Sequence, residues 1–185
     1  MGLYSYKENA MLSQRVLLAD GTYCDKMDAH INGFKHYAFS VMIFNSDNKV
    51  LLQRRAKSKY HSGGLWSNAC CGHPLKINSV EQIKEEAAKR LQKEMGICTK
   101  LKYKFIVNYQ ITCGQLVESE IDYVFEGYYN DKASIQINKD EVDSYRWLSY
   151  DEVLTEISMS PDVYTKWFRI IINDYPKKDE FNIFV

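Results

Sequence analysis

The sequence predicts a single α/β domain in which a mixed β-sheet is sandwiched between helices. Three observations support this prediction. The length of 185 residues is close to the roughly 150 typical of one domain, strand-like segments dominate the first two thirds, and helical segments are interspersed without a regular βαβ series. No internal repeat or Pro/Gly-rich linker divides the chain. We therefore treat residues 1–185 as one domain, and we expect residues 1–13 to be a loose N-terminal segment.

The first elements are strands joined by turns. Residues 14–18 are a short apolar strand that runs into Asp20-Gly21, a dipeptide that favours tight hairpins. After a polar stretch, residues 37–44 and 50–53 are typical of a hairpin, because a polar Asn-Ser-Asp-Asn turn separates them. Residues 54–78 are expected to be mainly loop.

The clearest helix spans residues 80–95. Ser79, with Gln82 three residues later, predicts a capping box at its start, and Gly96 supplies the stop. Apolar residues recur at helical spacing and predict one buried face. They are Val80, Ile83, Ala87 and Leu91.

The rest of the chain alternates again between strands and helices. Strands are predicted at residues 101–111, 116–128 and 144–148, and the first two form a long hairpin. Two helices follow the last strand. The first is capped by Ser149 with Glu152, and the second opens at Ser160-Pro161, because proline suits the first helical position.

Composition and charge narrow the function classes. The chain carries 24 Lys+Arg and 24 Asp+Glu, so its formal net charge is zero, which argues against a nucleic-acid or anionic-membrane binder. No apolar run approaches the roughly 20 residues that span a bilayer. Five cysteines at irregular spacing predict reduced thiols rather than a disulfide framework. We therefore expect a cytoplasmic protein with no membrane or nucleic-acid partner.

Three carboxylates lie in the strand-like segment VESEID. Residues two apart on a strand point the same way, so Glu118, Glu120 and Asp122 share one face. Two interpretations remain open from the strand alone: a solvated face of an edge strand, or a functional group of acids.

The histidines favour the functional interpretation. His36 leads directly into a predicted strand, and His73 lies in the compact turn Cys-Gly-His-Pro. A lone histidine is usually a satisfied polar residue, but several imidazoles with two strand carboxylates form a coherent metal site. Nitrogen ligands favour Zn, Fe or Mn, and the carboxylates move the preference toward Mn or Mg.

Other charged and sulfur-containing residues have alternative interpretations. Cys70-Cys71 is compatible with metal ligation, a reactive thiol or simple burial. The basic residues between Arg54 and Lys59 are either surface charge or a clamp for a phosphorylated ligand. Arg90 and Glu94 share a helix face, where they form a surface ion pair or hold a phosphate and a second cation.

Taken together, these segments resemble the type 1 isopentenyl-diphosphate Δ-isomerases, which belong to the Nudix superfold. The matching pieces occur in the same order and at similar spacing over roughly residues 14–165. They are LLQRRAKSK, WSNACCGHPL, RLQKEMGI, VESEID and IQINKDEVDSYRW. The combination of CCGHPL with ESE is far more specific than any single piece. The resemblance implies a Nudix-like fold and an enzyme that interconverts isopentenyl diphosphate and dimethylallyl diphosphate.

The resemblance also implies a set of binding residues. The family's divalent metal, Mn²⁺ or Mg²⁺, is bound at the positions of His30, His36, His73, Glu118 and Glu120. Glu94 matches the residue that contacts a second Mg²⁺, which accompanies the substrate diphosphate. The diphosphate itself is held at the positions of Lys26, Arg55, Lys59 and Arg90. The implied partner is a small allylic or homoallylic diphosphate, and the protein is expected to be a monomer or weak dimer.

The implied chemistry needs two proton-transfer groups. Cys71 and Glu118 correspond to the family's catalytic pair, with Tyr109 as an assisting hydroxyl. Moving a double bond by one carbon requires a proton to be added at one end and removed at the other, through a tertiary carbocation. Trp66 matches an aromatic position that stabilises the cation through its ring face. Asp162 stands where bacterial members carry a tryptophan that caps the cavity.

Three other functions compete with this one. A Nudix pyrophosphohydrolase needs a cluster of helix acids to bind the metals that activate water, but the equivalent positions are Lys89, Arg90, Lys93 and Glu94. A non-enzymatic ligand-binding module has little use for a thiol, two strand acids and three histidines. An isomerase of other allylic diphosphates would share the catalytic residues, so only a substrate screen separates it.

Overall fold

The fold is built around one large β-sheet in the computed structural model, which describes residues 15–130 and 133–179. The segment expected to be loose, residues 1–13, lies outside the described residues. Within them the sheet has seven strands, in the order β5-β4-β3-β8-β7, while β6 also pairs with β3 and β9 with β4. These strands are β3 (His36–Phe44), β4 (Val50–Arg55), β5 (Trp66–Ser67), β6 (Cys70–Gly72), β7 (Leu101–Cys113), β8 (Leu116–Tyr128) and β9 (Val142–Leu148).

Strand directions make the sheet mixed, as predicted. The central strands β3 and β8 run parallel, with His36 opposite Glu120, and the other pairs are antiparallel. The antiparallel pair β7 and β8 forms the long hairpin predicted around residues 112–115. A separate two-stranded sheet, β1 (Arg15–Leu17) with β2 (Tyr23–Asp25), surrounds the predicted Asp20-Gly21 turn.

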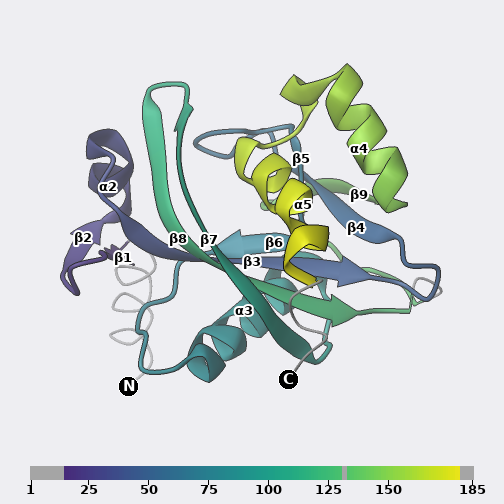
Figure 1. Cartoon of the computed structure of the whole chain (residues 1–185), viewed down its shortest axis with the longest axis horizontal. Coiled ribbons are helices and arrows are strands. Elements are labelled where there is room, and N and C mark those ends of the chain that lie inside the picture. Colours follow the sequence, from purple (N-terminus) through teal and green to yellow (C-terminus); the bar gives the residue numbers. More distant parts are fainter. Residues whose placement is uncertain (1–14, 131–132, 180–185) are drawn as a thin grey trace.

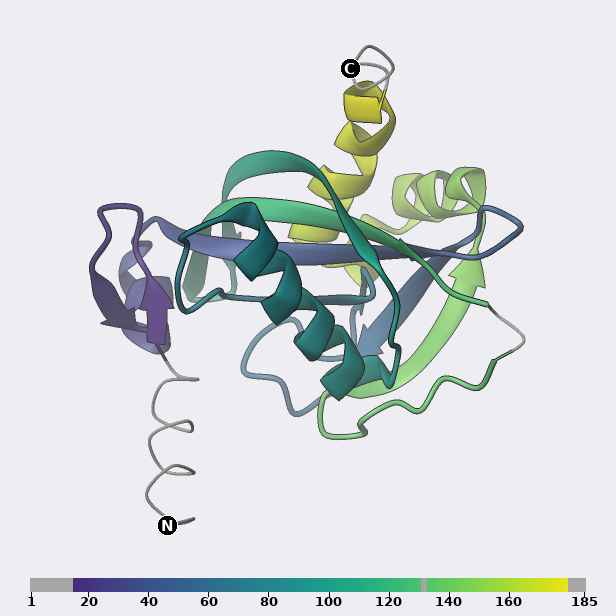
Figure 2. The same ribbon diagram turned by 90° about the horizontal axis from the view of Figure 1, so that it is seen from below.

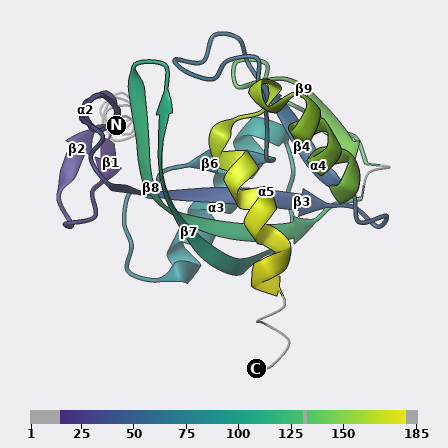
Figure 3. The same ribbon diagram turned by 45° about the horizontal axis from the view of Figure 1, so that its top comes forward.

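Helices cover both faces of the large sheet (Figure 1, Figure 2). Helix α3 (Val80–Met95) packs on one face, and α4 (Tyr150–Met159) and α5 (Lys166–Asp179) lie on the other. The short helix α2 (Lys26–Asn32) lies at one end of the sheet, beside the tip of the β7–β8 hairpin (Figure 3). In the described part of the chain, no helix is long and apolar enough to cross a membrane.

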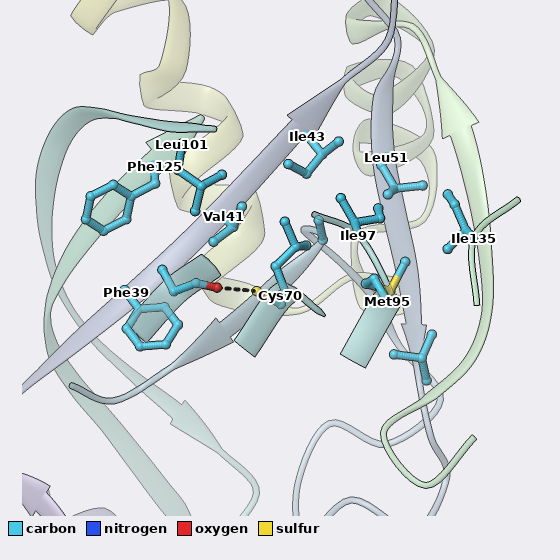
Figure 4. Packing of buried hydrophobic residues seen from close by; sticks show 14 of the residues in the cluster. Phe39, Val41, Ile43, Leu51, Cys70, Met95, Ile97, Leu101, Phe125 and Ile135 are labelled. Atoms are coloured by element: carbon cyan, nitrogen blue, oxygen red, sulfur yellow. Dashed lines mark hydrogen bonds between the residues drawn. The ribbon is translucent and has the colours of Figure 1, made fainter. Parts of the chain in front are cut away.

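Two hydrophobic layers follow from the alternation of side chains along β3. Phe39, Val41 and Ile43 face α3, and Figure 4 shows them with Cys70 and Met95 in one cluster. Met42 and Phe44 of β3 belong to the opposite layer with α4 and α5. Because β3 is buried on both faces, its sequence YAFSVMIF is apolar almost throughout rather than alternating.

The helix at residues 80–95 is confirmed to the residue. Ser79 accepts a hydrogen bond from the Gln82 amide, and Gly96 ends the helix in the left-handed conformation. In a full capping box the Gln82 side chain would also accept a hydrogen bond from the Ser79 amide. Here it accepts from the Asn78 amide instead. The Ser149–Glu152 capping box of α4 is present in full.

The structure adds detail to two expectations about secondary structure and contradicts a third. The polar stretch before β3 contains helix α2, capped by Asp25, whose side chain accepts from the Met27 and Asp28 amides. The segment at 54–78 is mainly loop, as expected, and also contains the short strands β5 and β6, which pair with β4 and β3. The last helix does not open at Pro161, because Pro161–Val163 is a single 3₁₀ turn and α5 begins at Lys166.

Candidate active site

Five side chains meet at one end of the sheet, beside α2. One ligand atom from each lies within 4.8 Å of all the others. The residues are His30, His36, His73, Glu118 and Glu120, which are the five that the sequence analysis expects to bind a metal. In residues 15–130 and 133–179, this is the one group of three or more such side chains that is this compact.

The local structure explains why residues far apart in sequence converge. His30 lies in the last turn of α2, and Gly33 then ends the helix with a φ of +65°, ahead of β3. His36 is the first residue of β3, so its Nε2 atom comes within 3.3 Å of the Nε2 atom of His30. The parallel register places His36 next to Glu120 on β8, at 3.3 Å between Nε2 and Oε1.

His73 reaches the same place from β6. A Cβ atom at the preceding residue, Gly72, would lie 2.7 Å from the Phe39 ring, so glycine lets β6 approach β3 closely. His73 Nε2 then lies 3.0 Å from Glu120 Oε1. In the sequence CCGHP, the glycine therefore allows the close strand contact, and the histidine after it joins the cluster.

The cluster fits a divalent metal. His36 donates from Nδ1 to the Phe34 carbonyl at 2.8 Å, which holds the ring with its Nε2 turned to the cluster. Glu118 Oε2 is buried without a hydrogen-bond partner, although it lies 3.1 Å from His30 Nε2. An ion held by three imidazole nitrogens and two carboxylates would satisfy that oxygen.

The fourth histidine, His61, also contacts the cluster, although the sequence analysis gives it no role. Its Nε2 atom lies 2.6 Å from Glu118 Oε1, and its ring packs edge-on against Trp167. His61 is thus positioned to orient Glu118 from outside the five-residue cluster. Its place in an irregular loop gave no spacing signal from which this contact could be predicted.

The protonation states of the two glutamates follow from these contacts. Burial would raise the pKa of Glu118, but the neighbouring imidazoles of His30 and His61 hold it below its ordinary value. Burial and the charge of Glu118 oppose ionisation of Glu120, yet the hydrogen bonds from His36 and His73 lower the pKa of Glu120 as well. Both carboxylates are therefore anionic at neutral pH, as metal ligands must be.

Tyr109 differs from expectation in its partner. Tyr109 is on β7, directly opposite Glu120 of β8. Its phenol donates a hydrogen bond to Glu120 rather than to Glu118. A second contact of 3.2 Å joins the phenol to Asp122, which also accepts from Ser40 at 2.8 Å. Burial, reinforced by the charge of Glu120, raises the pKa of Asp122 to about 8. Burial likewise raises the pKa of Tyr109 well above its ordinary value, so the phenol keeps its proton.

A cavity of about 740 Å³ opens beside the cluster. Its lining includes most of the predicted site residues: Lys26, Arg55, Lys59, Cys71, His73, Arg90, Tyr109, Glu118 and Glu120, together with His61 and Trp167. Cys71 therefore shares one cavity with Glu118 and Glu120 of the five-residue cluster. Burial raises the pKa of Cys71 to about 12, so its sulfur is a thiol and not a thiolate at neutral pH.

Trp66 lies away from this cavity. Its ring is covered by the Arg146 guanidinium, at 4.1 Å from Cζ to the ring centroid. The indole in the cavity wall is instead Trp167, whose ring lies 5.1 Å from the Arg55 Cζ atom. Asp162 lines a neighbouring cavity of about 610 Å³. Both cavities share Tyr60 and His61 as a common wall.

The predicted second-metal residue, Glu94, is buried on α3 outside the five-residue cluster. Arg90 Nε donates to one of its oxygens at 2.5 Å, and Gln53 donates to the other at 3.1 Å. A role for Glu94 toward a second ion stays a prediction. Arg90 and Lys59, both expected to bind diphosphate, share a further carboxylate, that of Glu141.

Comparison with known proteins gives concordant matches. Residues 34–168 match the family model of the NUDIX domain. An isopentenyl-diphosphate Delta-isomerase 2 from Photorhabdus laumondii is 43% identical over 155 residues, which are 83% of this chain and 85% of the relative. An isopentenyl-diphosphate Delta-isomerase from Pectobacterium atrosepticum is 41% identical, with 82% and 83% covered.

Solved structures agree at the level of the fold. A MutT protein from Methanosarcina mazei Go1 superimposes with a TM-score of 0.61 at 23% identity, covering 79% of this chain and 96% of that one. A MutT NUDIX hydrolase from Burkholderia pseudomallei gives a TM-score of 0.57 at 17% identity, covering 75% and 96%.

Proposed function

This chain belongs to the type 1 isopentenyl-diphosphate Δ-isomerases of the NUDIX family, and from that premise we propose that it interconverts isopentenyl diphosphate and dimethylallyl diphosphate. One observation carries the proposal: a single cavity is lined by the Cys71 thiol, the carboxylates of Glu118 and Glu120, and seven Lys or Arg side chains. These are the groups that the reaction requires, because it moves protons on a hydrocarbon attached to a diphosphate.

The diphosphate is held by the cations of the cavity in this proposal. Lys26, Arg55, Lys59 and Arg90 all line it, and Arg55 Nε is a buried donor without a hydrogen-bond partner. A phosphate oxygen would satisfy that donor. Trp167 forms an aromatic wall beside Arg55 and takes the place expected for Trp66 in stabilising a carbocation.

The reaction needs one proton added to the terminal carbon of the double bond and one removed on the other side of the cation. We assign these two transfers to Cys71 and to Glu120 with its Tyr109 partner. The sequence analysis expected Glu118 in this role, but both Glu118 oxygens face histidines, whereas Glu120 is hydrogen-bonded by the phenol. In this proposal Glu118 acts mainly as a ligand of the divalent metal ion.

The protonation states suit this division of work. Cys71 and Tyr109 carry protons at neutral pH, while Glu120 is anionic. Each turnover returns the site to the same number of protons, since one is donated and one accepted. The surrounding burial keeps water away from the cation.

A divalent ion at His30, His36, His73, Glu118 and Glu120 completes the site, with Mn²⁺ or Mg²⁺ as the proposed identity. When bound, it supplies positive charge that favours the ionised carboxylates and orients them toward the cavity. A second Mg²⁺, accompanying the diphosphate near Glu94, belongs to the same proposal.

The hydrolase alternative finds less support. Hydrolysis at a NUDIX helix needs several acids on α3, but Lys89, Arg90 and Lys93 line the cavity there. Glu94, the one acid at the four positions equivalent to the hydrolase motif, is engaged by Arg90 and Gln53. Its carboxylate is therefore compensated by neighbours rather than grouped with other acids.

Isopentenyl diphosphate supplied with Mg²⁺ or Mn²⁺ in deuterated water tests the proposal. We expect dimethylallyl diphosphate to appear with deuterium in it, and both signals to disappear with a chelator. Release of inorganic phosphate without a shift of the double bond would instead support the hydrolase. Longer allylic diphosphates in the same assay define the substrate range.

A cytoplasmic location is part of the proposal. All five cysteines are free thiols in the described structure, which suits a reducing compartment.

A further inference from the structure

The segment IQINKDEVDSYRW matches the isomerase family but has no role in the reaction described above. It contains Glu141, which precedes β9 and whose side chain is 17% exposed. A largely buried carboxylate at the edge of a cavity rich in cations calls for a physical reason, because an unpaired charge would be costly there.

The backbone holds Glu141 in a fixed place relative to the diphosphate-binding strand. The Ala56 amide donates to the Glu141 carbonyl at 3.0 Å, and the Glu141 amide donates to the Asn138 carbonyl at 3.0 Å. Ala56 directly follows Arg55, and Arg55 pairs with Val142 in the β4–β9 register. Glu141 lies in the turn before β9, and these backbone hydrogen bonds anchor it beside the strand that carries Arg55.

One oxygen of Glu141 meets two of the four cations assigned to the diphosphate. Lys59 Nζ forms an ion pair with Oε2, and Arg90 Nη2 lies 3.5 Å from the same atom. Burial opposes ionisation, but the Lys59 hydrogen bond and the Arg90 charge hold the pKa of Glu141 below its ordinary value.

The cations need such a partner because they crowd one another. Burial lowers the pKa of Lys26, and the positive charges of Lys59 and Arg90 lower it further. Seven Lys and Arg side chains line the cavity against three glutamates, so the basic side chains repel one another in the free protein. A carboxylate between two of them relieves this repulsion in the free protein.

We propose that Glu141 is the internal counter-ion of the diphosphate subsite, holding Lys59 and Arg90 until the diphosphate of the substrate takes them over. The inference rests on the proposed function and deepens it. Because the carboxylate and the diphosphate compete for the same cations, Glu141 weakens diphosphate binding and favours product release. Removing its charge should strengthen binding about tenfold, the size expected for one unit charge a few ångströms away in a partly solvated site.

Calorimetric titration of the full-length protein with inorganic pyrophosphate and Mg²⁺ tests this inference. Glu141→Gln keeps the shape of the side chain and should lower the Kd about tenfold. Glu81→Gln is the matched control, since it removes the same charge from an exposed site on α3, and it should leave the Kd within twofold. Steady-state assays should show a lower KM in Glu141→Gln without a higher kcat.

A merely structural role gives the opposite sign, because displaced cations would raise both Kd and KM. Unchanged or weaker pyrophosphate binding in Glu141→Gln therefore overturns the inference. If that variant does not fold, Glu141→Asp withdraws the carboxylate by one methylene and should strengthen binding by a smaller factor. Affinity equal to or below wild type in Glu141→Asp contradicts the counter-ion role.

The same titration separates this inference from the proposed function. Wild-type protein that binds pyrophosphate but shifts no double bond would refute the isomerase and leave the counter-ion in place. If the wild-type protein binds no pyrophosphate, the cavity is not a diphosphate subsite, and the counter-ion role of Glu141 is refuted as well.

Discussion

Tyr109→Phe isolates the proton-transfer role assigned to Glu120, because it removes one oxygen and keeps the ring. That oxygen hydrogen-bonds Glu120 and lies 3.2 Å from Asp122, in a position buried enough to raise the pKa of Tyr109 well above its ordinary value. A hydrogen bond to a charged partner is worth about 1.5–3 kcal/mol. If it is used fully in the transition state, kcat should fall roughly 10- to 100-fold.

The assay is formation of dimethylallyl diphosphate from isopentenyl diphosphate, with metal affinity measured in parallel. We expect KM and Mn²⁺ affinity to stay within about threefold of wild type. Tyr109 is not one of the Lys and Arg residues assigned to the diphosphate, and it is not part of the five-residue cluster. Tyr103→Phe removes the same atom from an exposed position on β7 and should leave kcat unchanged. An unchanged kcat in Tyr109→Phe, or a loss explained by weaker metal binding, would refute the reasoning.

Three further predictions concern the thiol, the orienting histidine and the metal. Cys71→Ser and Cys71→Ala should abolish turnover while circular dichroism and pyrophosphate binding stay as in wild type; near-normal turnover would exclude the thiol from catalysis. His61→Ala should weaken Mn²⁺ binding about 10- to 100-fold in calorimetry, because Glu118 loses the partner that orients it, and unchanged affinity would contradict this role. Mn²⁺ at about 100 times its Kd should stabilise the protein by roughly 2.7 kcal/mol over the chelated form, seen as a higher Tm, and His30→Ala should lose that shift.

Local signals in the sequence predicted the elements that depend on local interactions. The helix at residues 80–95 has the predicted cap and stop, and Ile83, Ala87 and Leu91 of its apolar stripe are buried. Val80, the first residue of the stripe, is exposed because it lies in the first turn. Helix α2 escaped prediction because its seven residues are too few for a clear apolar period. The last helix begins five residues after Pro161, since proline also suits the single 3₁₀ turn that forms there.

The candidate site was predictable to the extent that strand alternation and family resemblance define it. Alternation placed Glu118 and Glu120 on one face, and the resemblance supplied the histidines, which the structure brings within 4.8 Å of those carboxylates. Contacts that form only through tertiary packing could not be predicted from the sequence. His61 reaches Glu118 from an irregular loop, and Glu141 reaches Lys59 across 82 residues of sequence. No spacing pattern encodes either contact.

Anomalous diffraction from crystals grown with Mn²⁺ tests the central claim most directly. The account predicts one strong peak bonded to Nε2 of His30, His36 and His73 and to the carboxylates of Glu118 and Glu120, beside the Cys71 thiol. A Mn²⁺ ion bound at other residues, or no peak at Mn²⁺ concentrations that support turnover, would contradict it.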